Sequence, residues 1–227
     1  MENRKLFEPI ALAPNLVLRN RIAMAPMTTW AGNDDGTVSD DEEAYFRRRA
    51  KDVGLVITGC THVQANGIGF TGEFAAHDDR FIPSLARLAA AAKSGGAPAI
   101  LQIFHAGVKT RPELVSDVVG ASEVEGEAGP FAPALVPRAL RENEILDTIQ
   151  AFADATRRAI VAGFDGVELA GDQARGGGDQ RTQVAGILVP LHLRAHRVGY
   201  LRRQVVLELG LPLPQALRGK SLQRRHA

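Results

Sequence analysis

The chain has 227 residues, 45% of them apolar, which is enough for one globular domain with a sizeable core. Its single cysteine, Cys60, excludes a framework of internal disulfides, and no run of about 18 apolar residues supports a membrane span. The start Met-Glu-Asn-Arg-Lys lacks the apolar stretch of a secretory leader, so we expect a cytoplasmic protein with no membrane partner.

The net charge of +1 is the sum of two unlike parts. Residues 1–170 carry 17 basic and 23 acidic side chains, a net charge of −6, whereas residues 171–227 carry 10 and 3, a net charge of +7. The chain therefore changes character near Gly171. We expect a folded part over residues 5–170 and a separate tail over residues 171–227.

Short apolar runs alternate with helical patterns along the first part. The run "RIAMAPM" from Arg21 predicts a buried strand, and "SDDEE" predicts the start of a helix, with Ser39 as its cap and Glu42 returning a bond to the N–H of the cap. "GLVITG" predicts a second strand, and "FIPSLARLAAAAKSGG" predicts a helix that ends at Gly95.

The same alternation continues to residue 170. "PAILQIF" from Pro98 predicts a third strand, and "ENEILDTIQAFADATRRAIVAG" predicts a helix that ends at Gly163, before a fourth strand, "GVEL". Apolar strands separated by helices indicate a parallel sheet covered by helices, either a TIM barrel or a doubly wound sheet. The stretch "APMTTWAGNDDG" after the first strand lacks G-x-G-x-x-G, which favours the barrel.

Barrel enzymes carry their reactive residues at the carboxyl ends of the strands. In this chain those ends are residues 26–30, 59–61 and 102–105, and whatever follows Leu169. The sequence there resembles a known family, the old yellow enzymes or NADH:flavin oxidoreductases, which are FMN-binding TIM barrels. The resemblance rests on four segments in order, covering roughly residues 5 to 170: "LFEPIALAPNLVLRNRIAMAPMT", "ITGCTHVQANGIGF", "LQIFHAG" and "AGFDGVEL".

The resemblance implies a set of flavin contacts. The Thr28 hydroxyl donates to flavin O4, where negative charge gathers on reduction, and the Gln102 amide pairs with the pyrimidine edge of the ring. Cys60 stands at a position where the family has a small residue whose backbone N–H approaches the ring. For its sulfur we prefer the interpretation of a buried structural thiol. The other residues that lie against the ring are Ala25, Pro26 and Met27.

Two further residues stand near these strand ends. Trp30 occupies a position at which the family often has an aromatic lining of the substrate pocket, but a tryptophan near a strand end is a core residue about as often. Thr28 also has a plain alternative, a strand-end hydroxyl with no ligand. His105, in "HAG", more simply shapes its loop than catalyses a reaction.

The family's reaction follows from the resemblance. NAD(P)H reduces the FMN, and flavin N5 passes hydride to an activated alkene such as an enone, a small-molecule substrate. A segment like "VEIHGAHGY" then supplies the pair of side chains that holds the substrate carbonyl and the tyrosine that gives the proton. The chain has "VELAGDQARG" there, so the pair is replaced by Ala170 and Gln173 and the tyrosine by Arg175. We therefore assign no catalytic residue, and no metal ligand.

The resemblance stops at about Ala170. The tail from Gly171 has nine Arg and one Lys but no Phe, Asn or Met, a mixture typical of GC-rich coding DNA read in a shifted frame. We interpret it as a frameshifted, irregular or disordered segment. The alternative is a real basic extension, in which "LHLRAHRVGYLRRQVVLELGL" forms a helix for RNA or an anionic surface. Without a folded motif we do not assign a nucleic-acid partner.

Four strands make half of a TIM barrel. We therefore expect two unpaired sheet edges, with self-association through them, and no loops after strands seven and eight to hold the FMN phosphate. Two functions stay open from the sequence: a flavin-dependent ene-reductase, and a truncated, non-catalytic fragment of such an enzyme.

Overall fold

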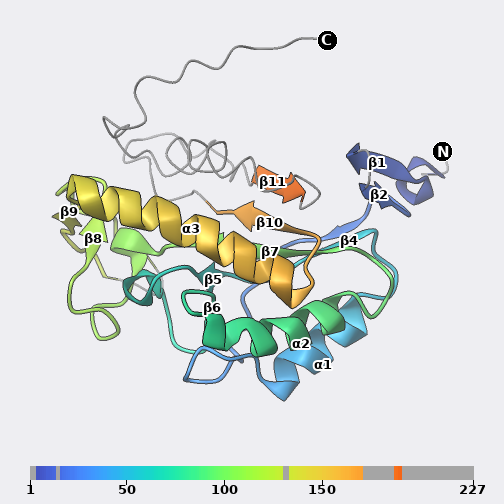
Figure 1. The fold of residues 1–227 in the computed structure, drawn as a ribbon, viewed down its shortest axis with the longest axis horizontal. Coiled ribbons are helices and arrows are strands. Elements are labelled where there is room, and N and C mark those ends of the chain that lie inside the picture. The colour runs from blue at the N-terminus through green and yellow to red at the C-terminus, as the bar shows by residue number, and fades with distance from the viewer. Residues whose placement is uncertain (1–3, 14–15, 130–132, 171–186, 191–227) are drawn as a thin grey trace, which may run out of the picture.

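A computed structural model describes residues 4–13, 16–129, 133–170 and 187–190 (Figure 1). Its main sheet has the strand order β11-β10-β7-β4-β3, and β3, β4, β7 and β10 are parallel neighbours in chain order. Sequential parallel neighbours are typical of a barrel, whereas a doubly wound sheet reverses its order at a switch point. The predicted half of a TIM barrel is confirmed. These strands are Ala23–Met24 (β3), Leu55–Ile57 (β4), Ala99–Phe104 (β7), Gly166–Leu169 (β10) and Ile187–Pro190 (β11).

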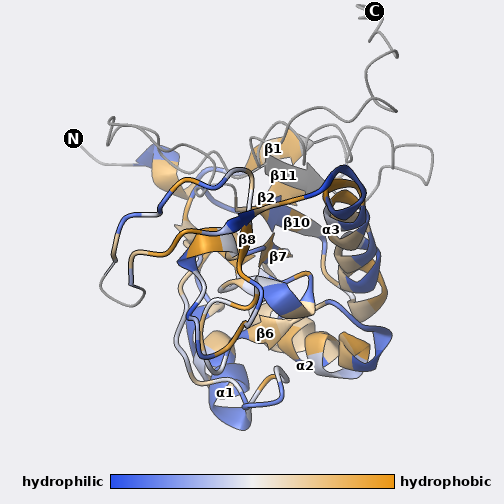
Figure 2. Ribbon diagram, turned by 90° about the vertical axis from the view of Figure 1, so that its left-hand side faces the viewer, coloured by the Kyte–Doolittle hydropathy of each residue, from blue (hydrophilic) through white to orange (hydrophobic). Residues whose placement is uncertain are grey.

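Three helices lie along one side of this sheet (Figure 1). Apolar side chains on the helices, such as Phe46, Leu88 and Phe152, share one core with Leu101 and Ile103 of β7. The strands and α2 are hydrophobic, whereas α1 is largely hydrophilic (Figure 2) and buries just two side chains. The helices are Asp40–Arg49 (α1), Ile82–Ala92 (α2) and Glu142–Ala162 (α3).

An antiparallel hairpin of β1 and β2 follows a short 3-10 helix at the start of the described residues. Leu16 and Leu18 of the hairpin pack on Leu55 of β4 and Ile100 of β7 as a second, smaller core. The remaining elements are short: Arg4–Phe7 (η1), Ile10–Ala13 (β1), Leu16–Leu18 (β2), Thr61–His62 (β5), Ala65–Gly67 (η2), Phe74–Ala75 (β6), Asp79–Phe81 (η3), Gly107–Lys109 (η4), Val119–Gly120 (β8) and Arg138–Ala139 (β9).

The first barrel strand differs from its prediction. "RIAMAPM" was expected to be buried, but β3 has two residues, of which Ala23 is exposed and Met24 half-buried. The reason is its place at the edge, since β3 pairs with β4 and with no other described strand. The other three strands lie where their apolar runs predict them.

The two predicted helix ends have different outcomes. Gly163 ends α3 in the left-handed conformation, with φ of 96°, as predicted. The prediction for α2 is wrong, because the helix ends at Ala92 with Lys93 as its C-cap, before Gly95, and the left-handed turn follows at Gly96, with φ of 82°. Gly95 has another role: a Cβ on it would lie 2.1 Å from the carbonyl oxygen of Ala50. It lets the chain after α2 pass close to the end of α1.

Part of the tail is a strand. β11 pairs with β10 in the antiparallel direction, with Ile187 opposite Leu169, so it does not continue the parallel series. The expectation of two unpaired edges is therefore wrong at β10, because β11 covers that edge. The rest of the tail lies outside the described residues.

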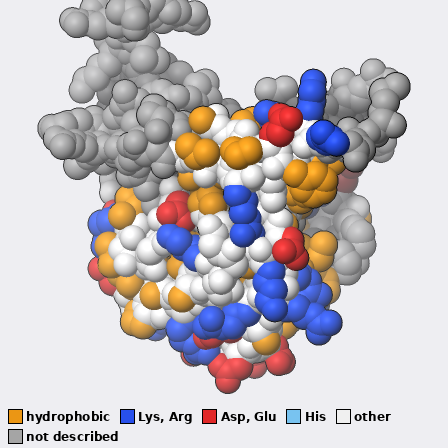
Figure 3. Space-filling model, turned by 90° about the vertical axis from the view of Figure 1, so that its right-hand side faces the viewer, with side chains coloured by type: hydrophobic (Ala, Val, Ile, Leu, Met, Phe, Trp, Pro, Cys, Tyr) orange, Lys and Arg blue, Asp and Glu red, His pale blue; other side chains and the backbone are white. Residues whose placement is uncertain are grey.

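The face at the amino ends of the strands carries basic and acidic side chains side by side (Figure 3). Near these ends, Arg19 donates hydrogen bonds to the carbonyl oxygens of Val53, at 2.9 Å, and Gly95, at 2.8 Å. It thereby ties the β2 hairpin to the ends of α1 and α2. In the part of the chain that the structure describes, no helix has the length and apolar character needed to cross a membrane.

Candidate functional site

Three neighbouring strands bring three of the predicted residues together. Gln102 lies on β7, Cys60 follows β4, and Thr28 follows β3. The Cys60 thiol donates to Oε1 of Gln102 at 3.1 Å, and the Thr28 hydroxyl is close enough to Cys60 to act on its pKa. The predicted juxtaposition at the carboxyl ends of the strands is therefore present.

Gly59 makes this close approach feasible. A Cβ on Gly59 would lie 2.7 Å from the carbonyl oxygen of Met27 and 3.2 Å from Cα of Thr28. No side chain fits there, since real Cβ atoms do not come within 3.0 Å of backbone oxygen. The loop after β3 therefore rests directly on the end of β4.

Glu168 on β10 is a member of the site that the sequence reading missed. It lies opposite Gln102 in the parallel register, and Nε2 of Gln102 donates to its Oε2 at 3.1 Å. Burial raises the pKa of Glu168, and the bond from Gln102 opposes this shift. The sequence could have identified Glu168 as a site candidate, because it is the one ionisable residue in the apolar run "GVEL".

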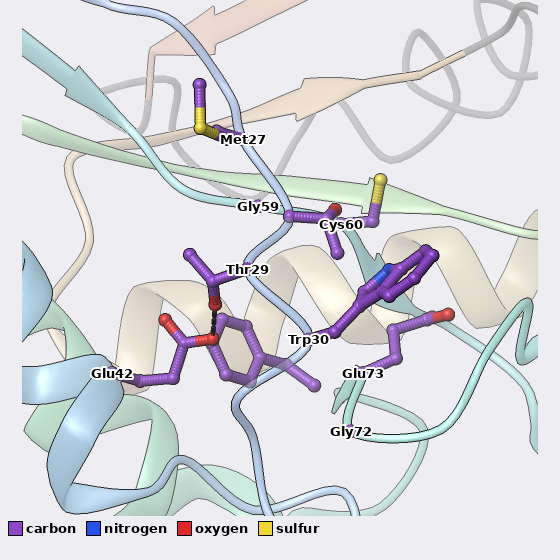
Figure 4. A pocket seen from close by; sticks show the side chains of 10 residues that line it. Met27, Thr29, Trp30, Glu42, Gly59, Cys60, Gly72 and Glu73 are labelled. Carbon is purple, nitrogen blue, oxygen red and sulfur yellow. Dashed lines mark hydrogen bonds between the residues drawn. The ribbon is translucent and has the colours of Figure 1, made fainter.

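A second carboxyl lies below the loop after β3. Glu42 of α1 was expected to complete a capping box, but its Oε1 accepts from the Thr29 hydroxyl instead (Figure 4). Ser39 does cap the helix, accepting from the Glu42 N–H at 3.1 Å. Glu42 is 2% exposed, burial raises its pKa, and its Oε2 has no hydrogen-bond partner among the described residues.

Glu42 and Thr29 line a small cavity with Cys60, Trp30 and Glu73 (Figure 4). Its volume is about 10 Å³, room for roughly one water molecule. The Oε2 of Glu42, unpartnered among the described residues, therefore lies buried directly beside the loop that carries Thr28 and the end of β4 that carries Cys60.

Behind this cavity is a buried pair, His62 and Glu73. Nδ1 of His62 lies 3.0 Å from Oε1 of Glu73, and Oε2 of Glu73 accepts from the Gly69 N–H at 2.8 Å. Burial lowers the pKa of His62 to about 4 and raises that of Glu73 well above its usual range. Both directions favour a neutral pair, which holds the β5 and β6 loops together.

The Cys60 thiol is predicted to be unreactive. Burial raises its pKa to about 11, against the hydrogen bond from Thr28, so the thiol stays protonated and acts as a donor to Gln102. At neutral pH we expect iodoacetamide to alkylate it about 10²-fold more slowly than an ordinary cysteine, because the thiolate is the nucleophile. In urea the same chain should react at the ordinary rate. Fast alkylation of the folded chain would contradict the assignment.

The remaining predicted residues have mixed placements. Ala25, Pro26 and Met27 follow β3 in the same loop, and Met27 is 59% exposed. Trp30 is 48% exposed and lines the cavity. His105 is half-buried, and its Nδ1 accepts from the Gly107 N–H at 3.1 Å, a bond that holds the loop.

The segment that follows β10 carries the three positions without family side chains. The N–H of Ala170 donates to the carbonyl oxygen of Ile103 at 3.1 Å, which extends the β10–β7 ladder by one residue. Its methyl group offers no hydrogen bond to a ligand. Gln173 and Arg175 lie outside the described residues. Among residues that are described, no group of three or more His, Cys, Asp or Glu is placed to hold a metal ion.

The polar side chains gathered at the carboxyl ends of these strands lie where barrel enzymes carry their active sites. The chain belongs to the NADH:flavin oxidoreductase / NADH oxidase family, whose family model matches residues 5–174. Proteins of this family are flavin-dependent and use nicotinamide coenzymes.

Named relatives agree with the family. The chain is 46% identical over 170 residues to the Bacillus subtilis protein named "Probable NADH-dependent flavin oxidoreductase YqiG", covering 74% of this chain and 44% of the relative. It is 40% identical over 171 residues to the Klebsiella pneumoniae NADH:fumarate oxidoreductase, covering 74% of this chain and 18% of the relative. The Trypanosoma cruzi old yellow enzyme superimposes with a TM-score of 0.65 and 31% identity, over 74% of this chain and 51% of that structure. The chain thus spans about half the length, or less, of these relatives.

Proposed function

We propose that residues 5–170 form the flavin-ring half of an FMN-dependent NAD(P)H oxidoreductase of the ene-reductase type, acting on a small activated alkene. The observation that carries this proposal is the convergence of Thr28, Cys60 and Gln102 at the ends of three adjacent parallel strands. When bound, the flavin supplies the hydride chemistry. The chain's own residues orient the ring and shape the space around it.

The hydrogen-bonding capacity of Gln102 fits a flavin edge. A carboxamide has two N–H donors and two lone pairs on its oxygen. Glu168 takes one donor and Cys60 occupies one lone pair, so one donor and one acceptor are left for the paired donor and acceptor of the pyrimidine edge. With flavin bound, the single O–H of Thr28 would turn from the Cys60 sulfur to the ring oxygen where charge develops on reduction.

Our proposal includes NADH as the reductant. Relatives named for NADH include the Klebsiella pneumoniae protein above and the Vibrio harveyi NADH:acrylate oxidoreductase, 37% identical over 169 residues.

The described residues contain no counterpart of strands seven and eight, whose loops hold the FMN phosphate in barrels of this type. In this proposal the described residues therefore bind the flavin ring and contribute little affinity through the FMN phosphate.

A non-catalytic role is the second candidate, and a specific observation favours it. Ala170 stands at the end of β10, where the family places the first side chain that holds a substrate carbonyl, and a methyl group makes no such bond. Losing positioned acid–base help typically lowers rates by about 10²–10⁴-fold.

The two candidates are separated by turnover. The 227-residue chain is loaded with FMN, reduced anaerobically with NADH, and mixed with cyclohexenone while the flavin absorbance is followed. Repeated reduction and reoxidation would support the first candidate for this chain. Because Ala170 offers no hydrogen bond to a substrate carbonyl, we expect the 227-residue chain alone to give slow or single reduction, which supports the second candidate. Repeated rapid reduction and reoxidation would refute the non-catalytic reading and show that residues after 170 supply the missing groups.

A further inference from the structure

An outer hollow of about 310 Å³ lies beside the small cavity and shares Trp30 and Gly72 with it. The side chains that line it are Trp30, Phe70, Thr71, Arg111 and Asp34. Because both spaces meet at Trp30, a ligand in the hollow would lie next to the candidate flavin site. The walls combine two aromatic rings with two side chains of opposite charge.

Trp30 has an unusual backbone conformation. Trp30 has φ of 56°, and among the described residues no other non-glycine residue has a positive φ. Such conformations persist where the surroundings enforce them and cluster at ligand sites. The neighbouring loop packs closely on this segment: a Cβ on Gly32 would lie 2.5 Å from the carbonyl oxygen of Gly72, and a Cβ on Gly72 would lie 3.1 Å from the carbonyl oxygen of Trp30.

Two aromatic side chains, Trp30 and Phe70, pack on each other at this hollow. The Trp30 and Phe70 rings have centroids 5.6 Å apart and planes tilted by 39°. Trp30 remains 48% exposed despite this contact. An exposed Trp30 ring packed on a half-buried Phe70 ring suits a flat, conjugated ligand, which buries apolar area against two aromatic side chains.

Arg111 supplies the charge. Its guanidinium pairs with Glu113 at 2.6 Å, but both side chains are well exposed, at 43% and 54%, and exposed ion pairs contribute little. A guanidinium has five N–H donors in a planar fork that matches an oxyanion, so donors are left for a ligand. Asp34 also lines the hollow but is exposed, so solvent screens its repulsion of a bound anion.

We propose that this hollow is a binding subsite for a flat, conjugated ligand carrying an oxyanion, with its π-system on Trp30 and Phe70 and its oxyanion on Arg111. The inference rests on the proposed function only in assigning the ligand to a flavin reaction. The oxyanion belongs either to a carboxylated alkene substrate or to the phosphate of the nicotinamide coenzyme. Arg111 is then the residue that determines the charge preference.

The chain provides its own reporter, because Trp30 is its single tryptophan. Its fluorescence is titrated with trans-cinnamate, cinnamamide and cinnamylammonium, three probes with one skeleton and different charges, after correction for probe absorbance. We expect cinnamate to bind about 10-fold more tightly than cinnamamide, and cinnamylammonium to bind most weakly. Arg111→Gln should remove the preference for cinnamate, and Arg111→Lys should keep part of it, because lysine retains the charge without the fork.

Two matched charge variants sharpen the test. Asp34→Asn and Glu113→Gln each remove a negative charge near Arg111, so each should strengthen cinnamate binding by a few-fold. Reduced nicotinamide mononucleotide, compared with its nucleoside, shows whether Arg111→Gln affects the coenzyme phosphate as well. If Arg111→Gln weakens cinnamate binding, Arg111 recognises the carboxylate of a substrate. If it weakens binding of the mononucleotide but not of the nucleoside, Arg111 recognises the coenzyme phosphate.

The proposal fails if cinnamylammonium binds more tightly than cinnamate, if no probe changes Trp30 fluorescence, or if Arg111→Gln leaves every anion unaffected. None of these titrations requires flavin. Their outcome is therefore separate from that of the proposed function, which fails if the chain binds no flavin.

Discussion

Replacing Gln102 by leucine is expected to weaken flavin binding by about 10²-fold. The substitution removes both hydrogen bonds to the pyrimidine edge, each contributing about 1 kcal/mol or more. It also removes the acceptor of the Cys60 thiol and the donor to Glu168, so the half-buried Glu168 carboxyl faces the ring without its partner. The measurement is a titration of FMN followed by flavin fluorescence.

The matched control is Gln150→Leu, the same change on α3, outside the site. It should leave the flavin affinity unchanged. An equal loss in both variants would indicate a general effect on folding, and an unchanged affinity in Gln102→Leu would remove Gln102 from the site.

The second large effect is on stability. Gly95→Ala is expected to lower the free energy of unfolding by about 3 kcal/mol, measured from urea denaturation, because overpacking against a fixed backbone is costly. The new Cβ would lie 2.1 Å from the carbonyl oxygen of Ala50 and 2.7 Å from Cα of Lys51, and neither is a flexible side-chain end. The shift needed to relieve this contact also disturbs the 2.8 Å bond from Arg19 to the Gly95 carbonyl.

Gly129→Ala serves as the comparison, since a Cβ there meets nothing within 4 Å and the residue has no positive φ. It should change the free energy of unfolding by less than about 0.5 kcal/mol. Equal effects at the two glycines would show that the contact between Gly95 and the end of α1 is not important for stability.

The sheet could be predicted because its strands are apolar on both faces and stand at regular intervals between helices. This holds for β4, β7 and β10, which are internal to the described sheet. It fails for β3, whose exposure depends on a neighbouring strand rather than on its own residues. β11 was missed because a four-residue segment in an arginine-rich tail has no periodicity to identify it.

The candidate site was predictable where a residue type and a strand end coincide, as for Thr28, Cys60 and Gln102. Local patterns misled at Glu42, which fits a capping box in sequence but reaches the Thr29 hydroxyl in space. The contact joins α1 to the loop after β3, 13 residues earlier, and no local rule contains it. Glu168 was missed because its partner Gln102 lies 66 residues away.

The central claim is that the described part of the chain binds the flavin ring but contributes little to holding the phosphate. It is tested most directly by comparing the affinities of the 227-residue chain for riboflavin and for FMN, which differ by the phosphate alone. The account predicts that both bind, with affinities within about 10-fold of each other, because it assigns no charged phosphate contact to the described residues and such a contact usually adds about 1.5–3 kcal/mol per hydrogen bond. FMN binding that is 10³-fold tighter than riboflavin binding, or the absence of binding by either flavin, would contradict it.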